Sequence, residues 1–298
     1  MREGRDEVSV TDLQQQPVMV IGAGTMGRGI AQVVAEAGYP TLLHDADQVG
    51  LQRGVDAIRH AWARLVEKGK RSPEDVDGCV SRLRTATSID EASSAAVVIE
   101  AVFEHLEVKT GLFRALDAIV GEDALLTSNT SSISLTRLAA ATSTSERVVG
   151  LHFFNPVPVL PLVEVVRALQ TSDRTAERAV SFAASLGKTP VVVNDSPGFV
   201  ANRILLPMIN EAVFTLGEGV ATAEAIDEVM KLGMAHPMGP LALADLIGLD
   251  VCLDILQTLH RDFGDDKYRP APLLTRMVAA GRLGRKSGHG FYAYPESR

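Results

Sequence analysis

Short runs of apolar, mostly β-branched residues recur along the chain as far as residue 193 and alternate with longer segments of mixed polarity. The runs are apolar at successive positions rather than at alternate ones, a pattern typical of strands buried on both faces of a parallel sheet. Strands that alternate with helices predict an α/β fold with helices on both faces of that sheet. The predicted strands are residues 18–21, 41–43, 97–99, 125–127, 148–151 and 191–193.

The longer segments carry helix signals. Residues 51–70 are predicted to form a long helix, and a second helix is predicted to begin at Ser72. There, Ser72 is a favourable cap, Pro73 suits the first turn, and two acidic residues follow at the positive end of the helix. This order of strand, helix and strand is the pattern of a Rossmann-type domain.

The pattern changes after residue 193. Residues 194–198, Asn-Asp-Ser-Pro-Gly, interrupt regular structure, and no further strand is predicted before the last ten residues. A length of 298 residues suits two domains of about 150. With the interruption at 194–198 as the boundary, we expect a flexible polar leader at 1–16, a Rossmann domain at 17–195 and a smaller all-helical domain at 196–298. The helices predicted in the second domain are residues 199–218, 223–232, 241–259 and 272–280.

Composition narrows the class of protein. Hydrophobic residues make up 46% and charged residues 22%, which excludes a disordered chain, a collagen and a coiled coil. The net charge of −8 predicts no nucleic-acid or membrane partner. Cys79 and Cys252 lie far apart and suggest neither a disulfide nor a metal site, and neither a signal peptide nor a membrane span is recognisable. We therefore expect a soluble cytoplasmic protein without a bound metal.

The first predicted strand runs directly into a Gly-x-Gly-x-x-Gly motif that opens a helix. In the mechanism of such loops, Gly22 permits a tight turn, Gly24 lets the backbone approach a pyrophosphate, and Gly27 lets helix and strand pack closely. The helix N-terminus then binds the anion. This context favours a dinucleotide site over a glycine-rich turn without a ligand.

Asp45 follows the second predicted strand, where a carboxylate can accept hydrogen bonds from a ribose 2′-hydroxyl. A carboxylate there would repel a 2′-phosphate, so NAD is expected rather than NADP. The alternative is an aspartate that caps the next helix, a role that Asp47 is also placed to take.

Polar residues that are unusual for a scaffold follow two later strands. Residues 128–132, Ser-Asn-Thr-Ser-Ser, are either part of a ligand crevice or helix caps. His152 ends a buried strand and is suited to act as a base near neutral pH. Glu164 lies among aliphatic residues on a strand and needs a partner, which His152 would provide. A purely structural His–Glu pair is the alternative.

Asn202 lies near the start of the first helix after the domain boundary. We expect it either to face a cleft between the domains and donate a hydrogen bond to a substrate carbonyl, or to tie the two domains together.

The chain resembles the short-chain 3-hydroxyacyl-CoA dehydrogenase family, most closely its bacterial 3-hydroxybutyryl-CoA members. The resemblance covers residues 18 to 294 and is carried by motifs in the family's order. It implies NAD-dependent interconversion of (S)-3-hydroxyacyl-CoA and 3-oxoacyl-CoA. The motifs are Gly-Ala-Gly-Thr-Met-Gly at 22–27, Ser-Asn-Thr-Ser-Ser at 128–132, His-Phe-Phe-Asn-Pro at 152–156, Pro-Gly-Phe-Val-Ala-Asn-Arg at 197–203, Met-Gly-Pro at 238–240 and Gly-His-Gly-Phe-Tyr at 288–292.

The resemblance also implies roles for individual residues. His152 would be the general base, Glu164 its orienting partner, and Ser131 and Asn202 would hold the reacting oxygen and the acyl group. Glu104 and Lys109 would contact the nicotinamide end of NAD, although their spacing alone indicates only a solvated helix start. The resemblance further implies that Thr25 and Met26 of the glycine loop, and Asn129, contact the cofactor. It also implies that a basic residue at the end of the long helix, Lys68, Lys70 or Arg71, contacts coenzyme A, and a solvated helix end is the alternative for each of them.

Alternatives remain at the level of substrate and role. The same fold would serve a longer or carboxylated acyl-CoA, a carrier-protein thioester or a free hydroxy acid. A dinucleotide-binding sensor without catalysis is a second class, against which the intact set of Ser131, His152, Glu164 and Asn202 argues. The helical domain contains more aliphatic side chains than about a hundred residues can bury, and with the resemblance this predicts a homodimer formed through that domain.

Overall fold

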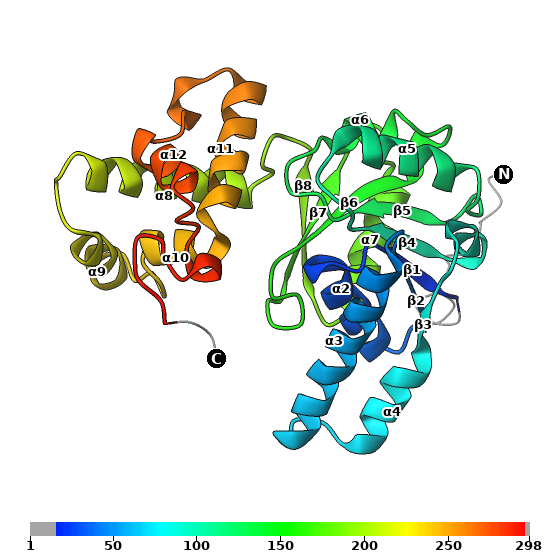
Figure 1. Cartoon of the computed structure of the whole chain (residues 1–298). Helices are drawn as coiled ribbons and strands as arrows, with labels where there is room; N and C mark the ends of the chain where they lie inside the picture. Colours follow the sequence, from blue (N-terminus) through cyan, green and yellow to red (C-terminus); the bar gives the residue numbers. More distant parts are fainter. Residues whose placement is uncertain (1–15, 296–298) are drawn as a thin grey trace. The chain divides into compact units, whose positions relative to one another are not determined.

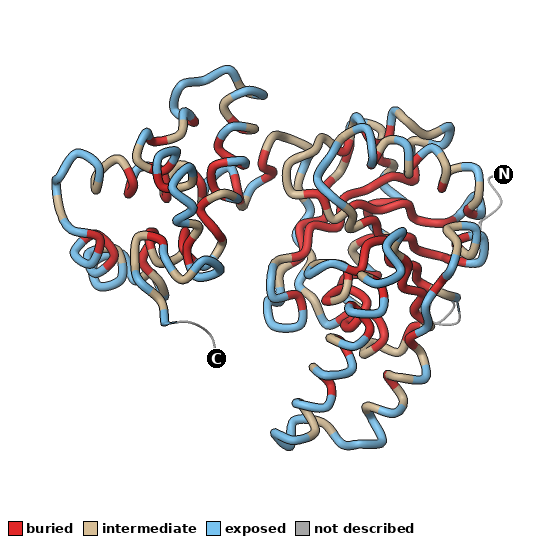
Figure 2. Tube along the Cα trace, viewed as in Figure 1, coloured by how far each residue is buried: buried red, intermediate tan, exposed pale blue. Residues whose placement is uncertain are grey.

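The computed structural model describes residues 16–295, so the expected leader lies outside the described residues except for Gln16. The chain forms two compact units, the first ending at Asp195 and the second beginning at Ser196. Each unit buries an apolar core of its own (Figure 2).

The first unit is built on one eight-stranded sheet in the order β3-β2-β1-β4-β5-β6-β7-β8 (Figure 1). All neighbouring strands are parallel except β6 and β7, which are antiparallel. The mostly parallel sheet of the prediction is therefore confirmed. The strands are β1 (Val18–Ile21), β2 (Thr41–His44), β3 (Leu83–Thr85), β4 (Val97–Glu100), β5 (Leu125–Ser128), β6 (Val148–Phe153), β7 (Leu162–Arg167) and β8 (Thr189–Asn194).

Helices cover both faces of this sheet, as predicted. Helices α2, α3, α4 and α7 share one apolar core with the strands, and α5 and α6 lie on the opposite face (Figure 1). The core that α2, α3, α4 and α7 share with the strands contains Trp62 and Phe182, both fully buried. The helices are α2 (Thr25–Glu36), α3 (Gln48–Glu67), α4 (Pro73–Arg82), α5 (Leu106–Asp117), α6 (Leu135–Ala139) and α7 (Asp173–Ser185).

Side-chain caps decide where two of these helices begin. The carboxylate of Asp47 accepts a hydrogen bond from the N–H of Val49, so α3 starts at Gln48 and ends at Glu67, three residues before the predicted 51–70 at each end. Helix α4 begins as predicted, because the Ser72 hydroxyl accepts a hydrogen bond from the N–H of Asp75.

The prediction for residues 191–193 was wrong in one respect. They form strand β8, but this strand is the edge of the sheet and is not buried on both faces. Val191 and Val192 are 45% and 49% exposed. Apolar residues at successive positions therefore do not distinguish a central strand from an edge strand that is packed on one side.

The second unit is helical, with η3 (Asp266–Tyr268) and η4 (Arg285–Ser287) as short 3-10 turns, so the predicted fold class holds throughout the described residues. The single helix predicted at 241–259 was wrong, because Gly248 adopts a φ of 107° and separates two helices. Only glycine adopts that conformation readily. The helices are α8 (Ala201–Gly217), α9 (Ala223–Gly233), α10 (Pro240–Ile247), α11 (Leu249–Phe263) and α12 (Pro272–Ala279).

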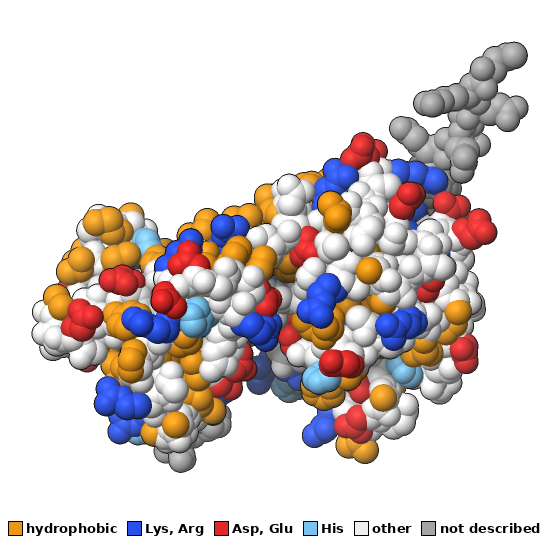
Figure 3. Space-filling view, turned by 90° about the horizontal axis from the view of Figure 1, so that it is seen from above, with side chains coloured by type: hydrophobic (Ala, Val, Ile, Leu, Met, Phe, Trp, Pro, Cys, Tyr) orange, Lys and Arg blue, Asp and Glu red, His pale blue; other side chains and the backbone are white. Residues whose placement is uncertain are grey.

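The surface of the described residues carries charges of both signs. On the face shown in Figure 3, acidic and basic side chains are interspersed rather than gathered by sign. Over residues 16–295, no helix has the length and apolar character needed to cross a membrane. The same stretch contains no cluster of three or more His, Cys, Asp or Glu side chains arranged to hold a metal ion.

Candidate active site

The carboxyl ends of four parallel strands are aligned by the register of the sheet. Ile21 pairs with His44 on one side and with Glu100 on the other, and Glu100 pairs with Ser128. The residues that follow these strands therefore emerge at one edge. In doubly wound sheets this edge is where ligands bind.

The glycine loop follows β1 at this edge and fits a pyrophosphate. A Cβ on Gly22 would lie 2.4 Å from the carbonyl oxygen of Ala101, and a Cβ on Gly27 would lie 1.7 Å from that of Gly22. A Cβ on Gly24, in contrast, would meet no atom of a more distant described residue within 4 Å, and within the described residues no side chain caps helix α2. Open space beside uncapped N–H groups is the environment that a bound phosphate requires.

Asp45 is tied to this loop. Its Oδ2 accepts a hydrogen bond from the N–H of Ala23 at 2.7 Å, and its Oδ1 accepts one from the N–H of Asp47 at 2.9 Å. The cap of the next helix is Asp47, so the alternative role considered for Asp45 belongs to its neighbour. A carboxylate has lone pairs beyond these two bonds and can also accept a ribose hydroxyl.

His152 and Glu164 lie directly opposite each other on the antiparallel strands β6 and β7. Their Nδ1 and Oε2 atoms are 2.8 Å apart, and both residues are buried. The neutral ring makes this contact in the tautomer with the proton on Nδ1, because an ionised carboxylate can only accept. The expected contact is present, and in that tautomer Nε2 is the basic atom of the ring.

His152 and the strand that carries it make further contacts. The ring of Phe154 lies 4.5 Å from it, centroid to centroid. The side-chain oxygen of Asn129, which follows β5, accepts a hydrogen bond from the N–H of Phe153 at 2.9 Å. Asn129 thus joins the end of β5 to the strand that carries His152.

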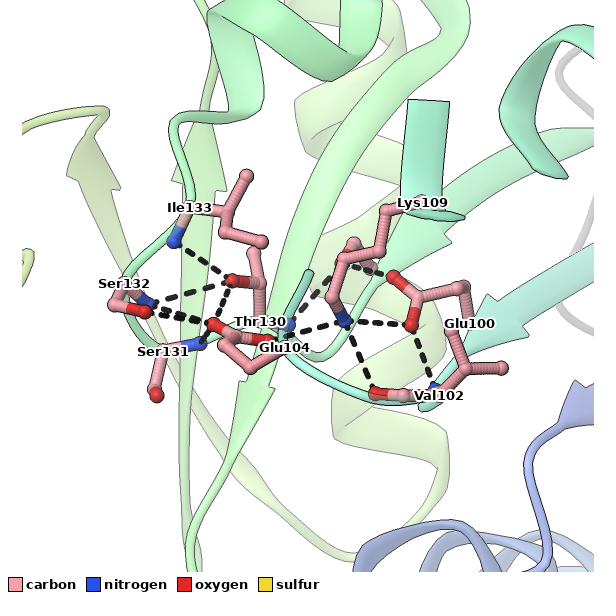
Figure 4. A network of polar contacts seen from close by, with 9 residues as sticks. Glu100, Val102, Glu104, Lys109, Thr130, Ser131, Ser132 and Ile133 are labelled. Carbon is pink, nitrogen blue, oxygen red and sulfur yellow. Dashed lines mark hydrogen bonds and ion pairs between the residues drawn. The ribbon is translucent and has the colours of Figure 1, made fainter. Parts of the chain in front are cut away.

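Glu104 and Lys109 do not form a solvated helix start. The Lys109 side chain is 1% exposed, and its ammonium lies 2.6 Å from Glu100 and 3.1 Å from Glu104 (Figure 4). Burial by itself would raise the pKa of Glu104. The charge of Lys109 and hydrogen bonds from Thr130 and Ser132 outweigh this and hold the pKa below its ordinary value.

The remaining predicted residues are more dispersed. Thr25 and Met26 begin helix α2, next to the glycine loop. Lys68 follows the last residue of α3 and is exposed. Ser131 lies in the loop after β5, and Asn202 is a buried residue in the first turn of α8 in the second unit.

Sequence reasoning missed Glu100. It is the last residue of β4, is fully buried, and contacts both Lys109 and Ser128. The available signal was an acidic residue directly after an apolar run, which is close to the signal that pointed to Glu164, an acid within an apolar run.

Comparison with known proteins identifies relatives over nearly the whole chain. The family model "3-hydroxyacyl-CoA dehydrogenase, NAD binding domain" matches residues 17–196, and "3-hydroxyacyl-CoA dehydrogenase, C-terminal domain" matches residues 198–294. A probable 3-hydroxybutyryl-CoA dehydrogenase of Bacillus subtilis is 52% identical over 95% of this chain and 99% of that protein. A 3-hydroxybutyryl-CoA dehydrogenase of Bradyrhizobium diazoefficiens is 51% identical over 93% of this chain and 94% of that protein.

The fold is also similar to that of a solved 3-hydroxybutyryl-CoA dehydrogenase, the enzyme named for these relatives. The crystal structure of (S)-3-hydroxybutyryl-CoA dehydrogenase from Ralstonia eutropha superimposes with a TM-score of 0.91 at 49% identity. The match covers 95% of this chain and 100% of that one.

Proposed function

The chain belongs to the 3-hydroxyacyl-CoA dehydrogenase family, and we propose that it interconverts (S)-3-hydroxybutyryl-CoA and acetoacetyl-CoA with NAD(H). The enzyme class, an NAD-dependent 3-hydroxyacyl-CoA dehydrogenase, follows from the family. The short acyl chain follows the names of the relatives. The observation that carries the proposal is the buried His152–Glu164 pair, 2.8 Å apart, on the sheet that also carries the glycine loop.

His152 is the general base in this proposal. When the substrate hydroxyl is oxidised, Nε2 takes the O–H proton, and in the reverse reaction the imidazolium returns it to the carbonyl oxygen. Glu164 holds the ring in the tautomer with the proton on Nδ1 and balances the positive charge that forms on it. Ser131 and Asn202 donate hydrogen bonds to the reacting oxygen and the acyl group.

The cofactor of this family is NAD, and residues of this chain fit it. The first turn of α2, with Gly24, Thr25 and Met26, would hold the pyrophosphate, and Asp45 would accept the adenosine ribose hydroxyl. Glu104, Lys109 and Asn129 would lie toward the nicotinamide. NAD, when bound, accepts the hydride from the hydroxyl-bearing carbon, and NADH returns it in the reverse direction.

The direct test is NADH consumption with acetoacetyl-CoA, run beside NADPH and beside longer 3-oxoacyl-CoAs. We expect turnover of acetoacetyl-CoA with NADH, and slower turnover with NADPH because Asp45 would face the 2′-phosphate. Faster turnover of a longer or carboxylated acyl-CoA would reassign the substrate. Binding of NADH without turnover of any thioester would support the sensor alternative instead.

We also propose a cytoplasmic homodimer formed through the helical unit. Both cysteines, Cys79 and Cys252, are free and buried, in keeping with a reducing compartment. Val220, Val229 and Leu232 are 70%, 62% and 77% exposed, and apolar side chains are visible over this unit in Figure 3. In this proposal these side chains belong to one apolar patch that the partner covers, since large contiguous apolar patches mark interaction surfaces. Light scattering should give twice the chain mass of 31.8 kDa, and a mass of one chain would contradict the proposal.

A further inference from the structure

Glu100 is placed where a carboxylate is costly, and three donors compensate it. Its Oε1 accepts hydrogen bonds from the N–H of Val102 at 2.7 Å and from the Lys109 ammonium at 2.6 Å. Its Oε2 accepts one from the Ser128 hydroxyl at 2.6 Å. A buried charge with such partners is held in one position, because each lost contact would leave a desolvated polar group.

Lys109 connects Glu100 to a second carboxylate, that of Glu104. Its ammonium reaches from helix α5 to Glu100, to the carbonyl oxygen of Val102 at 3.3 Å and to Oε2 of Glu104 at 3.1 Å (Figure 4). The side chains of Glu100 and Lys109 are 0% and 1% exposed, whereas that of Glu104 is 37% exposed. Of these three side chains, Glu104 is therefore the one that is exposed enough to change its position.

Glu104 in turn organises the loop after β5. Its Oε1 accepts hydrogen bonds from the N–H groups of Ser131 and Ser132, both at 3.1 Å, and from the hydroxyls of Ser132 and Thr130. In Figure 4 the Ser131 side chain points away from Glu104 while its N–H faces it. The backbone of the Ser131 loop, residues 130–132, is therefore built around one oxygen of Glu104.

We propose that Glu100 is a positioning residue, which holds Lys109 against Glu104 and thereby sets the loop that presents Ser131. The inference rests on the proposed function, in which Ser131 contacts the substrate. Without the charge of Glu100, the buried ammonium would have Glu104 as its main counter-charge and would draw that carboxylate toward itself. The Ser131 loop would then lose its shared acceptor and shift.

The main test is Glu100→Gln, which keeps the shape of the side chain and removes its charge. A displacement of about 1 Å at a substrate contact can cost about 100-fold, so we expect kcat/KM for acetoacetyl-CoA to fall about 10- to 100-fold. At saturating NADH, which removes any loss that comes from weaker cofactor binding by Glu104 and Lys109, the same change in a Ser131→Ala background should cost less than about threefold, because effects that act through one group are not additive. An equal loss in both backgrounds, or a wild-type rate in Glu100→Gln, would overturn the inference.

A second pair of variants covers the case in which Glu100→Gln does not fold. The double variant Glu100→Gln/Lys109→Met removes both buried charges together, which proteins often tolerate. Its kcat/KM should match that of Lys109→Met alone, because Glu100 acts through Lys109. A double variant clearly less active than Lys109→Met would also overturn the inference.

Glu107→Gln is the matched control. Glu107 lies in the first turn of the same helix, and its side chain is 80% exposed, so wild-type kinetics are expected. The wild-type protein separates the two proposals. No turnover of acetoacetyl-CoA by the wild type would refute the function, whereas an active wild type with an unaffected Glu100→Gln would refute only the role of Glu100.

Discussion

Both units bury carboxylates, but these carboxylates face different partners. In the first unit, Glu164 faces the imidazole of His152, and Glu100 faces the ammonium of Lys109. In the second unit, Asp245 accepts hydrogen bonds from the N–H groups of Phe291 and Tyr292 and from the Tyr294 hydroxyl, each at 3.0 Å. The two sheet carboxylates face groups that can carry a positive charge, and Asp245 faces neutral donors.

Asp227 follows the second pattern. It accepts hydrogen bonds from the N–H groups of Leu241 and Ala242 and from the Tyr292 hydroxyl. Together, Asp227 and Asp245 fix the start of α10 and the path of the chain near its C-terminal end. Burial and the neighbouring Asp245 carboxylate raise the pKa of Tyr294, so this hydroxyl stays neutral.

The difference separates two uses of a buried carboxylate. One that faces a base or an ammonium controls charge where a reaction needs it, and one that faces backbone N–H groups controls where the chain runs. Loss of the first kind should therefore impair turnover more than folding, and loss of the second kind should impair folding more than turnover.

The largest effect is expected for His152→Gln. General acid–base catalysis contributes up to about 10⁴-fold, so kcat should fall about 10³- to 10⁴-fold. NADH should still bind, because the glycine loop is unchanged, and a fluorescence titration of NADH measures this. A variant that kept most of its rate would show that His152 is not the base.

Glu164→Gln should have the next largest effect. Glutamine can still orient the ring through its carbonyl oxygen, but it cannot balance the imidazolium that forms during oxidation. We expect kcat to fall about 10- to 100-fold, which corresponds to the roughly 1.5–3 kcal/mol of a hydrogen bond to a charged group. Steady-state kinetics and thermal unfolding together test this. A large loss of stability at unchanged kcat would place Glu164 with Asp245, among the carboxylates that only hold the fold.

Asp245→Asn should reverse this pattern. An amide can present only one oxygen, so its NH₂ group would face the N–H or hydroxyl donors that the second carboxylate oxygen now accepts. Loss of hydrogen bonds to a charged group predicts about 1.5–3 kcal/mol lower free energy of unfolding. Urea denaturation measures this, while kcat per folded molecule should stay within about twofold. A large loss of kcat in fully folded protein would contradict the distinction.

The smallest effect concerns Cys252 in the helical unit. Burial, and then the carboxylates of Asp250 and Asp245, raise the pKa of this thiol to about 12. The stability that this shift represents is complete below the pKa of an unfolded thiol and is lost as the pH rises toward 12. Iodoacetamide should therefore leave Cys252 unlabelled in the folded protein at mildly alkaline pH. Rapid labelling would show that this unit tolerates buried charge after all.

Local patterns along the sequence were sufficient for the main elements. The glycine motif after an apolar strand predicted the β1–α2 turn, and Ser72 predicted the start of α4, because both signals act over a few residues. The pairing of His152 with Glu164 was also accessible. Two polar residues on consecutive apolar strands have few partners except each other.

The tertiary structure decided what depends on contacts between distant segments. The edge position of residues 191–193 and the break at Gly248 were not readable, because an apolar run has the same pattern in a central strand, an edge strand or a helix. The buried position of Lys109 was missed because its spacing along the chain gives no sign of the contacts with Glu100 and Glu104.

The sequence by itself determined the α/β class, the dinucleotide motif and the family. The tertiary structure decided that Glu100, Lys109 and Glu104 form one network with the Ser131 loop. Their side chains come from a strand, the loop after it and a helix, and the loop they hold follows the next strand. Only the register of the sheet brings these segments together, because hydrogen bonds and charges act through space rather than along the chain.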